Sequence, residues 1–379
     1  METYKLSDLC EILDAKRKPL SALQRAKKQG IYPYYGAQGI IDHLDEYLLD
    51  GEYLLVAEDG ANLETRNQPI ANIAKGKIWV NNHAHVLGSN GKCPLNLLGF
   101  ILNNMNISPY VTGCAQPKLN QENLRNIEIE LPSHIDSIAS ILSSLDRKIE
   151  LNNKINADLE EMAQAIFKNW FVDFEPFKDG EFVDSELGMI PEGWKVGSPY
   201  EYVKVVYGAP YKSAKFNDNG EGLPLIRIRD LKDCNPQFYT PEILPQTEYV
   251  NMGDIVAGMD AEFVPHIWKG KTGLLNQRVC KLMPQQTSIS NLFVLYLMKP
   301  ELEFVQSYKT GTTVSHLGKA DIDKFVVVLP PLEVVDECSK LLDSILQRIK
   351  NISAESRTLS LLRDTLLPRL MSGEIEVPE

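Results

Sequence analysis

Apolar residues recur at alternating three- and four-residue intervals along residues 135–170, which is the pattern of a long helix packed against another helix. The series consists of Ile135, Ile138, Leu142, Leu145, Ile149, Asn152, Asn156, Leu159, Ala163, Ile166 and Trp170. A second series, 200 residues further on, consists of Val335, Cys338, Leu342, Ile345, Ile349, Ile352, Ser356, Leu359, Arg363, Leu366 and Leu370. The two series predict two long helices that pair along one seam.

Asn152 and Asn156 occupy seam positions where apolar residues are expected. A buried Asn at such a position can fix the register and orientation of paired helices. The alternative is that the middle of the seam is hydrated, and the sequence leaves both interpretations open. Because the matching positions of the second series are Ile352 and Ser356, any pairing of the asparagines is asymmetric.

The repetition extends beyond the two helices. TGCAQPKL at residues 112–119, followed by IEIELP, corresponds to TGTTVSHL at residues 310–317, followed by FVVVLP. Earlier in each half, DGEYLLVA resembles MGDIVA, and WVNNH at residues 79–83 parallels LLNQR at residues 274–278. The order domain, helix, domain, helix is typical of a duplicated unit.

Each globular half is predicted to be rich in strands. Alternating or β-branched runs between Gly, Pro, Asn and Asp turns predict strands at residues 77–80, 223–228, 254–257 and 325–329. Shorter helices are expected at residues 95–104 and 290–298, and residues 31–39 are expected to form a flexible stretch rich in aromatic and amide groups. The predicted fold class is α+β, with two similar domains separated by two long antiparallel coiled-coil helices and related by a pseudo-twofold internal repeat.

These patterns divide the chain into six predicted segments. They are a first domain at residues 1–132, a first long helix at 133–174, a linker at 175–193, a second domain at 194–331, a second long helix at 332–371 and a tail at 372–379. Pro368 is expected to limit the second helix. About 36 residues at 1.5 Å per residue give a helix roughly 54 Å long. Two such helices running antiparallel would hold the two domains apart at opposite ends.

The composition is that of an ordinary globular protein, with 44% hydrophobic and 24% charged residues. No apolar run approaches the ~20 residues that cross a bilayer, and the first residues lack a signal-peptide core, so a cytoplasmic protein is expected. Cysteines at positions 10, 93, 114, 234, 280 and 338 show no metal-binding spacing and are expected to be reduced.

The net charge of −12 is unevenly distributed. Residues 1–130 hold 13 basic and 15 acidic side chains, and residues 200–282 hold 10 of each. Residues 133–192 hold 5 basic and 13 acidic side chains, so most of the excess lies on the first long helix and the segment after it. The nearly neutral domains can still present basic faces, and the acidic total does not exclude nucleic acid.

The sequence offers no recognisable catalytic, cofactor-binding or metal site. His83 and His85 would share one face of a strand, but no third ligand lies at a metal-like spacing. Acidic residues at 254–262 with Lys269 and Lys271 could imitate a nuclease cluster, but nothing in the sequence fixes their geometry and solvated surface charge accounts for them better. Phosphate-binding loops and hydrolase signatures are missing from the sequence.

Both halves instead contain clusters of aromatic, amide and basic residues. Arg and amide side chains suit base edges in the major groove, whereas Lys, Ser and backbone amides suit phosphates, although each residue alone could be ordinary surface. The candidate DNA-binding residues are Tyr34, Tyr35, Gln38, Asn62, Arg66, Asn81, Asn82, His83, Lys212, Lys215, Arg227, Arg229, Lys269, Lys271, Asn276, Gln277 and Arg278.

Motifs across nearly the whole chain resemble the specificity (S) subunit of type I restriction–modification enzymes. The resemblance rests on YYGA at residues 34–37, DGEYLLVAEDG at 50–60, WVNNHAH at 79–85, residues 112–119, QAIFKNWFVDF at 164–174, LGMIPEGW at 187–194 and LLPRLMSG at 366–373. The resemblance implies two target recognition domains, each reading one half of a bipartite double-stranded DNA sequence, with the helices setting the unread gap.

The resemblance also implies partners that carry the chemistry. Two methyltransferase (M) subunits would supply S-adenosylmethionine binding and adenine methylation, and two restriction (R) subunits would supply ATP- and Mg-dependent translocation and cleavage. This chain would itself carry no catalytic residue, no cofactor and no metal. Inserting whole helical turns into residues 135–170 is then expected to lengthen the unread gap, and the isolated chain is expected to bind DNA weakly.

Two other functions fit some of the same features. A scaffold whose helices join two protein-binding modules would need no DNA, and it predicts no salt-dependent binding to a duplex with two half-sites. A methyltransferase with its own cofactor site would need a glycine-rich turn after a strand, and residues 235–238, NPQF, lack both that turn and a second proline.

Overall fold

The structure is a computed structural model that describes residues 2–113, 116–309, 316–375 and 377. Residues 114–115 and 310–315 of the two repeated motifs, and residues 376 and 378–379 of the predicted tail, lie outside the described residues. The chain forms two compact units: unit 1 contains Met1–Ile149 and Leu359–Glu379, and unit 2 contains Glu150–Thr358. Both units mix strands and helices, so the α+β class and the organisation into two domains are confirmed.

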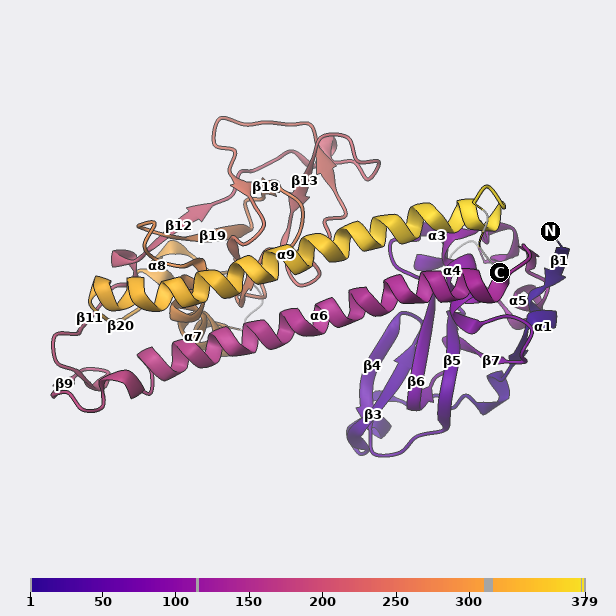
Figure 1. Ribbon diagram of the computed structural model, residues 1–379, viewed down its shortest axis with the longest axis horizontal. Helices are drawn as coiled ribbons and strands as arrows, with labels where there is room; N and C mark the ends of the chain where they lie inside the picture. The colour runs from indigo at the N-terminus through magenta and orange to yellow at the C-terminus, as the bar shows by residue number, and fades with distance from the viewer. Residues whose placement is uncertain (1, 114–115, 310–315, 376, 378–379) are drawn as a thin grey trace. The chain divides into compact units, whose positions relative to one another are not determined.

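A six-stranded sheet lies at the centre of unit 1, in the order β2-β7-β5-β6-β3-β4 (Figure 1). Its strands are β2 (Cys10–Ile12), β3 (Gln29–Gly36), β4 (Gly39–Leu44), β5 (Leu49–Ala57), β6 (Ala71–Val80) and β7 (Ala84–Ser89). A separate pair joins β1 (Glu2–Lys5) to β8 (Glu128–Leu131). The short helices of this unit are α1 (Leu6–Leu9), η1 (Asp14–Lys16), α2 (Ala22–Ala26), α3 (Asn62–Thr65), α4 (Leu95–Asn104), η2 (Ser108–Tyr110) and α5 (Gln121–Arg125).

Strand β5 is buried on both faces because its side chains alternate between two hydrophobic clusters. Leu54 and Val56 pack with α4 and the chain ends of the unit, whereas Leu55 packs on the other face with Ile78 and Val86. The continuous apolar run of β5 therefore places this strand in the middle of the sheet, where it supports the loops at its end.

Unit 2 contains two four-stranded sheets, in the orders β12-β19-β16-β17 and β14-β13-β18-β15. Their strands are β12 (Val203–Tyr207), β13 (Leu223–Ile226), β14 (Tyr239–Thr240), β15 (Tyr249–Val250), β16 (Ile255–Gly258), β17 (Pro265–Ile267), β18 (Gly273–Leu275) and β19 (Val279–Pro284). Two small pairs join β9 (Phe182–Ser185) to β10 (Gly188–Pro191) and β11 (Lys195–Gly197) to β20 (Val327–Leu329). Its shorter helices are η3 (Glu175–Phe177), η4 (Pro199–Glu201), η5 (Ser213–Lys215), η6 (Ile228–Asp230), α7 (Asn291–Lys309) and α8 (Lys319–Ile322).

The two long helices are α6 (Ile135–Phe171) and α9 (Leu332–Met371), and each contributes residues to both units. Within unit 2, Asn152 Nδ2 donates to Glu355 Oε2 over 2.8 Å and Asn156 Nδ2 donates to Ser353 Oγ over 3.0 Å. A higher residue number on α6 thus meets a lower number on α9, so the two helices run antiparallel within unit 2.

The residues of the predicted seam are all buried or half-buried. Many of them belong to the globular cores as well as to the helix pair. Ile138 and Leu142 join the core of unit 1, and Leu342 and Ile349 join the core of unit 2. The residues of the heptad series therefore make two kinds of contact: helix against helix, and helix against the core of the adjacent unit.

Three local expectations differ from the structure. Residues 31–39 belong largely to strand β3 and its turn, because Tyr34 faces the interior and is 1% exposed. Pro368 does not end α9, because burial of Leu367 and Leu370 in unit 1 offsets the one missing hydrogen bond. The predicted helix 290–298 extends past Pro300 to Lys309 for the same reason, with further core contacts after the proline. The helix expected at residues 95–104 is confirmed as α4.

Candidate nucleic-acid interface

The aromatic candidates of unit 1 lie on β3. Tyr34 is buried, and its hydroxyl accepts a hydrogen bond from the backbone N–H of Leu20 over 2.9 Å. Tyr35 is half-buried, and its carbonyl accepts from the Asn81 backbone N–H over 3.0 Å. Gln38 is exposed in the turn between β3 and β4. Of these three candidates, only Gln38 is exposed.

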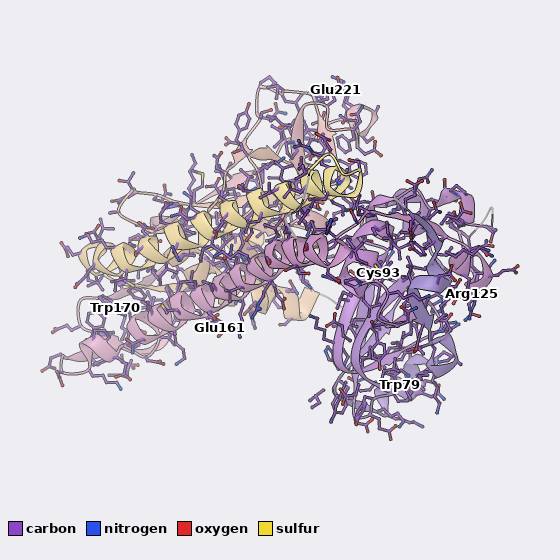
Figure 2. All side chains as sticks on the ribbon, turned by 45° about the vertical axis from the view of Figure 1, so that its right-hand side comes forward. Trp79, Cys93, Arg125, Glu161, Trp170 and Glu221 are labelled. Carbon is purple, nitrogen blue, oxygen red and sulfur yellow. The ribbon has the colours of Figure 1, made fainter. Side chains whose placement is uncertain are left out.

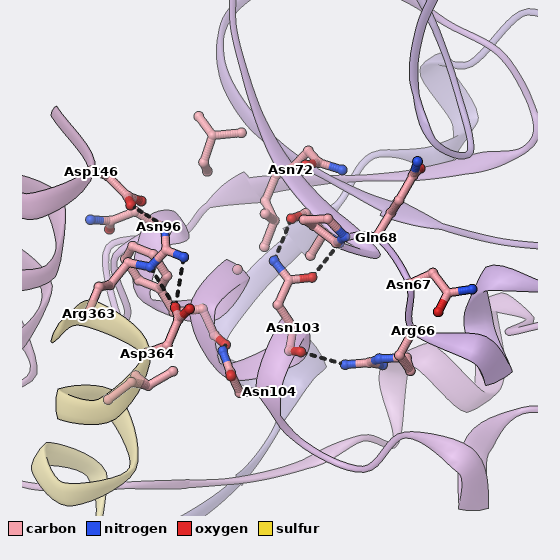
Figure 3. Close-up of a pocket in the computed structure, with 17 residues that line it drawn as sticks. Arg66, Asn67, Gln68, Asn72, Asn96, Asn103, Asn104, Asp146, Arg363 and Asp364 are labelled. Atoms are coloured by element: carbon pink, nitrogen blue, oxygen red, sulfur yellow. Dashed lines mark hydrogen bonds and ion pairs between the residues drawn. The ribbon is translucent and has the colours of Figure 1, made fainter. Parts of the chain in front are cut away.

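Asn62 and Arg66 have structural roles beside a polar cavity of about 440 Å³ (Figure 3). The Asn62 amide exchanges two hydrogen bonds with the backbone of Gln68, which closes the loop after α3. Arg66 Nη2 donates to the carbonyls of Leu102 and Asn103, both over 2.8 Å, and so caps the C-terminus of α4. Burial lowers the pKa of the Arg66 guanidinium. Neither side chain is free to reach a base edge in this arrangement.

Other polar side chains of that cavity also bind the protein itself. Asn103 holds the start of β6 through three hydrogen bonds to the backbone of Ile70 and Ala71. Arg363 of α9 donates to Asp146 of α6 over 2.6 Å and to Asp364 over 2.7 Å. The cavity therefore marks where sheet, α4 and both long helices meet inside unit 1.

Residues 81–83, the first turn, connect β6 to β7 and present two of the candidates. Asn81 is 5% exposed, and its Oδ1 accepts from the backbone N–H of His83 over 2.8 Å. This side-chain bond to the residue two positions later is an Asx turn, which holds the loop in one conformation. Asn82 and His83 are consequently displayed at the surface.

Residues 276–278, the second turn, connect β18 to β19 in the same way. Asn276 is 8% exposed, and its Oδ1 accepts from the backbone N–H of Arg278 over 3.3 Å. Gln277 and Arg278 are displayed at the surface of unit 2. The sequence parallel between residues 79–83 and 274–278 thus corresponds to one shared local structure.

The backbone around the two turns also repeats. In unit 1, Glu58 N–H donates to the His83 carbonyl over 2.9 Å, and Leu119 N–H donates to the Glu58 carbonyl over 2.8 Å. In unit 2, Met259 N–H donates to the Arg278 carbonyl over 2.9 Å, and Leu317 N–H donates to the Met259 carbonyl over 2.7 Å. Each unit therefore holds its turn beside the loop after its central strand and beside the end of its repeated motif.

Three of the six other basic candidates of unit 2 are paired with acidic or aromatic groups. Lys215 pairs with Glu242 over 2.8 Å, and the Arg227 guanidinium lies 5.3 Å from the centre of the Phe238 ring. Lys269 pairs with Glu160 of α6. Lys212, Arg229 and Lys271 are exposed. Among the described residues, no ion pair or side-chain hydrogen bond links these basic side chains to the second turn.

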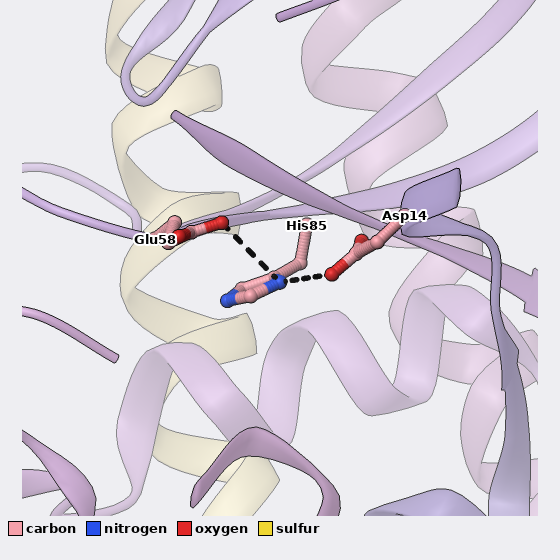
Figure 4. Close-up of side chains that lie close together, drawn as sticks. All are labelled: Asp14, Glu58 and His85. Carbon is pink, nitrogen blue, oxygen red and sulfur yellow. Dashed lines mark hydrogen bonds and ion pairs between the residues drawn. The ribbon is translucent and has the colours of Figure 1, made fainter. Parts of the chain in front are cut away.

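A buried group of charges lies beneath the first turn and consists of Asp14, Glu58 and His85 (Figure 4). His85 is 0% exposed; its Nε2 donates to the Leu119 carbonyl over 2.7 Å, and its Nδ1 donates to Asp14 Oδ2 over 2.6 Å. Both ring nitrogens face acceptors, so neither offers a lone pair to a metal. His83 is exposed and contacts Asp59 instead, so the two histidines considered together in the sequence do not form one site.

Arg17 completes this buried network. Its Nη1 lies 2.5 Å from Glu58 Oε2 and its Nη2 lies 3.2 Å from Asp14 Oδ2. Burial raises the pKa of Asp14, but the hydrogen bond and charge of His85, with Val86 N–H and Arg17, outweigh it and lower that pKa below its usual value. The pKa of Glu58 is lowered in the same way by Arg17 and Lys118 against the effect of burial. The network joins η1, the end of β5 and β7 under the first turn.

Four residues at the two turns were missed among the sequence candidates: Asp59, Lys118, Asp260 and His316. Each contacts a turn residue or its neighbour. The only sequence signal was that Lys118 and His316 occupy equivalent places in the repeated motifs 112–119 and 310–317.

Side chains on the long helices differ sharply in exposure. Figure 2 labels Glu161 and Trp170 on α6 and Trp79 within unit 1. Glu161 is exposed and Trp170 packs partly against the core of unit 2.

Among the described residues, the helices are each too short or too polar to cross a membrane.

Comparison with known proteins identifies the family to which these features correspond. The family model described as type I restriction modification DNA specificity domain matches residues 1–161 and 191–359. The chain is 29% identical over 296 residues to the type I restriction enzyme MjaIX specificity subunit of Methanocaldococcus jannaschii, covering 70% of this chain and 65% of that protein. It is 28% identical over 190 residues to the EcoBI specificity subunit of Escherichia coli, covering 49% and 40%.

A solved structure has the same fold at low sequence identity. The crystal structure of the type I restriction–modification S subunit from M. genitalium has a TM-score of 0.54 and 14% identity, covering 100% of this chain and 96% of that one. The alignments with the MjaIX and EcoBI subunits span less than two thirds of those proteins' lengths.

Proposed function

The chain belongs to the family of type I restriction–modification DNA specificity proteins, and from this premise we propose that it is the DNA-recognition subunit of a type I restriction–modification complex. In this role it reads a bipartite target in double-stranded DNA, one half with unit 1 and the other half with unit 2. It carries no catalytic residue of its own.

The observation that carries the proposal is the repeated turn framework. Two domains that differ in most of their sequence hold Asn81 and Asn276 in the same Asx turn and display different polar pairs after them. A reader of two half-sites on one duplex needs such a recurring scaffold, because it meets the same sugar–phosphate backbone at both halves while the bases, which other loops contact, differ. Loops on a rigid scaffold are where such recognition resides.

We further propose that the units form a pseudo-twofold internal repeat and that α6 and α9 act as an antiparallel coiled-coil spacer. Support comes from the cross-helix hydrogen bonds of Asn152 and Asn156 in unit 2 and from the Arg363–Asp146 pair in unit 1. Both helices contribute to both units, so their length sets the number of unread base pairs between the half-sites.

The chemistry belongs to partner subunits in this proposal. Two methyltransferase subunits dock on the chain and bind S-adenosylmethionine, and two restriction subunits use ATP and Mg. The acidic excess of residues 133–192 supports protein rather than DNA contact along α6, because acidic side chains repel phosphates.

The test is to express the chain with its partner subunits in a host that lacks other adenine methyltransferases and to map methylated adenines across the genome. The proposal expects methylation at two short sequences separated by a fixed unread gap, and none when this chain is omitted. A scaffold without a DNA role would leave the methylated sequence independent of the chain, and that outcome would exclude the proposed function.

A further inference from the structure

An aspartate holds an imidazole beside each of the two turns. In unit 1, His83 Nδ1 donates to Asp59 over 2.7 Å, and in unit 2, His316 Nδ1 donates to Asp260 over 2.7 Å. The two aspartates are equivalent, since each follows the residue that bonds to the carbonyl of its turn. The two histidines are not equivalent, because His83 lies in the first turn and His316 is the residue before the end of the second repeated motif.

The positions of the imidazole and of a cationic side chain are exchanged between the two units. Lys118 occupies the place in unit 1 that His316 occupies in unit 2, and Arg278 occupies the place of His83. Lys118 pairs with Glu58 over 3.1 Å, and Arg278 pairs with Asp260 over 3.3 Å. The side chains of the two histidines and two cations are 44–55% exposed. Both units therefore display one imidazole and one cation at exchanged positions.

An exposed amide accompanies each pair, Asn82 in unit 1 and Gln277 in unit 2. We call the resulting groups the donor sets: Asn82, His83 and Lys118 in unit 1, and Gln277, His316 and Arg278 in unit 2. Because the aspartate engages Nδ1 of each imidazole, Nε2 is the nitrogen left for an outside ligand. The amide and the cation offer hydrogen-bond donors to an anionic oxygen. The imidazole donates to it from Nε2 only when the ring carries a second proton, because Nδ1–H is already bonded to the aspartate.

The retention of this chemistry in both units indicates what the ligand is. Bases differ between two half-sites, whereas the sugar–phosphate backbone is the same in both, and phosphate contacts position a protein without specifying sequence. Resting on the proposed function, we propose that each donor set binds a backbone phosphate beside its half-site. Asp59 and Asp260 are positioning residues that orient the imidazoles, and base reading is left to other loops.

The experiment uses the assembled complex with its methyltransferase subunits. Binding is measured for a duplex that the complex methylates and for a duplex of equal length with both half-sites scrambled, over a series of salt concentrations. The variants are Lys118→Gln, Arg278→Gln, His83→Gln and His316→Gln. The matched controls are His43→Gln in unit 1 and Lys204→Gln in unit 2, both at exposed positions outside the donor sets.

The donor-set variants are expected to weaken binding to both duplexes by the same factor, on the order of tenfold, while the methylated sequence stays unchanged. Lys118→Gln and Arg278→Gln should also reduce the slope of log affinity against log salt by about 0.9 each. The controls should change neither quantity. A changed methylated sequence would overturn the inference in favour of base contact, and lost methyltransferase binding with unchanged DNA affinity would overturn it in favour of partner docking.

Asp59→Asn tests the positioning role separately. Its loss of affinity should match that of His83→Gln, and the double variant should lose no more than either single variant, because both remove the same oriented Nε2. The ¹⁵N spectrum of His83 should change its tautomer pattern in Asp59→Asn, and an unchanged pattern with unchanged affinity would contradict the role. Failure of the unaltered complex to distinguish the two duplexes would instead refute the proposed function.

Discussion

Asn156 on α6 donates a hydrogen bond to Ser353 Oγ on α9 over 3.0 Å, inside the seam of unit 2. Its Oδ1 is buried and has no hydrogen-bond partner among the described residues. Asn156 also borders a polar cavity of about 300 Å³, which is large enough for ordered water. The two interpretations of the seam asparagines are therefore compatible, since one end of the amide pairs across the helices and the other borders a cavity.

Replacing Asn156 distinguishes pairing from packing. Asn156→Ala removes the cross-helix bond and should lower the free energy of unfolding by about 1 kcal/mol. Asn156→Leu removes the unpaired buried acceptor and adds apolar surface, so it should be as stable as the unaltered chain or more so. Urea unfolding of the two variants checks this, and a Leu variant less stable than the Ala variant would contradict it.

The buried network under the first turn makes unit 1 sensitive to acid. The pKa values of Asp14 and Glu58 are lowered from 3.8 and 4.5, so their stabilising effect is complete above those values and is lost as the pH falls through the lowered ones. Hydrogen exchange of peptides from β5 and β7 should therefore accelerate as the pH drops below about 4.5, after correction for the intrinsic rate. Exchange that depends on pH equally in both units would contradict this role.

Removing one partner from that network should be costly. Asp14→Ala leaves His85 and Arg17 buried without their shared acceptor, and such a loss lowers the free energy of unfolding by about 3–5 kcal/mol. Asp45→Ala, at an exposed position, serves as the control and should change it by less than about 0.5 kcal/mol. The free energy of unfolding is measured by urea unfolding, with hydrogen exchange of peptides from β7 as the readout. Equal effects of the two substitutions would argue against the network.

The sequence predicted what depends on periodicity and repetition. The two long helices, α4 and the correspondence of the two turns all follow from patterns within short windows. The structural roles of Tyr34, Asn62 and Arg66 could not be predicted, because each depends on a partner in another element, such as the α4 carbonyls that Arg66 caps. The Asp260–His316 contact joins residues 56 positions apart, and no local pattern marks it.

A matched insertion tests the spacer. One heptad is added to α6 between Ile149 and Glu150 and another to α9 between Thr358 and Leu359, where the two units divide. Seven residues at 1.5 Å lengthen a helix by about 10.5 Å, which corresponds to about three base pairs at 3.4 Å each. The mapped gap should grow by about that number with both half-sites unchanged.

A one-sided insertion serves as the control. Added to α6 alone, seven residues cannot preserve both the Asp146–Arg363 pair and the Asn152–Glu355 bond. Reduced stability and loss of methylation are expected, rather than a longer gap. An unchanged gap in the matched variant would contradict the spacer role.

The isolated chain should bind DNA weakly. Its net charge is −12, and the basic candidates Lys215, Lys269 and Arg278 are already paired with carboxylates. Fluorescence anisotropy should find that the chain alone has low affinity for a duplex carrying the target sequence. Adding the methyltransferase subunits should increase both the affinity and the selectivity strongly. Tight, sequence-selective binding by the chain alone would contradict this expectation.

Each unit is proposed to read one half of a bipartite target. The most direct measurement exchanges residues 1–132 for the corresponding domain of a relative with a different target and maps methylated adenines across the genome. One half of the methylated sequence is expected to change to that of the donor, while the other half and the gap are retained. A change in both halves, or in neither, would contradict it.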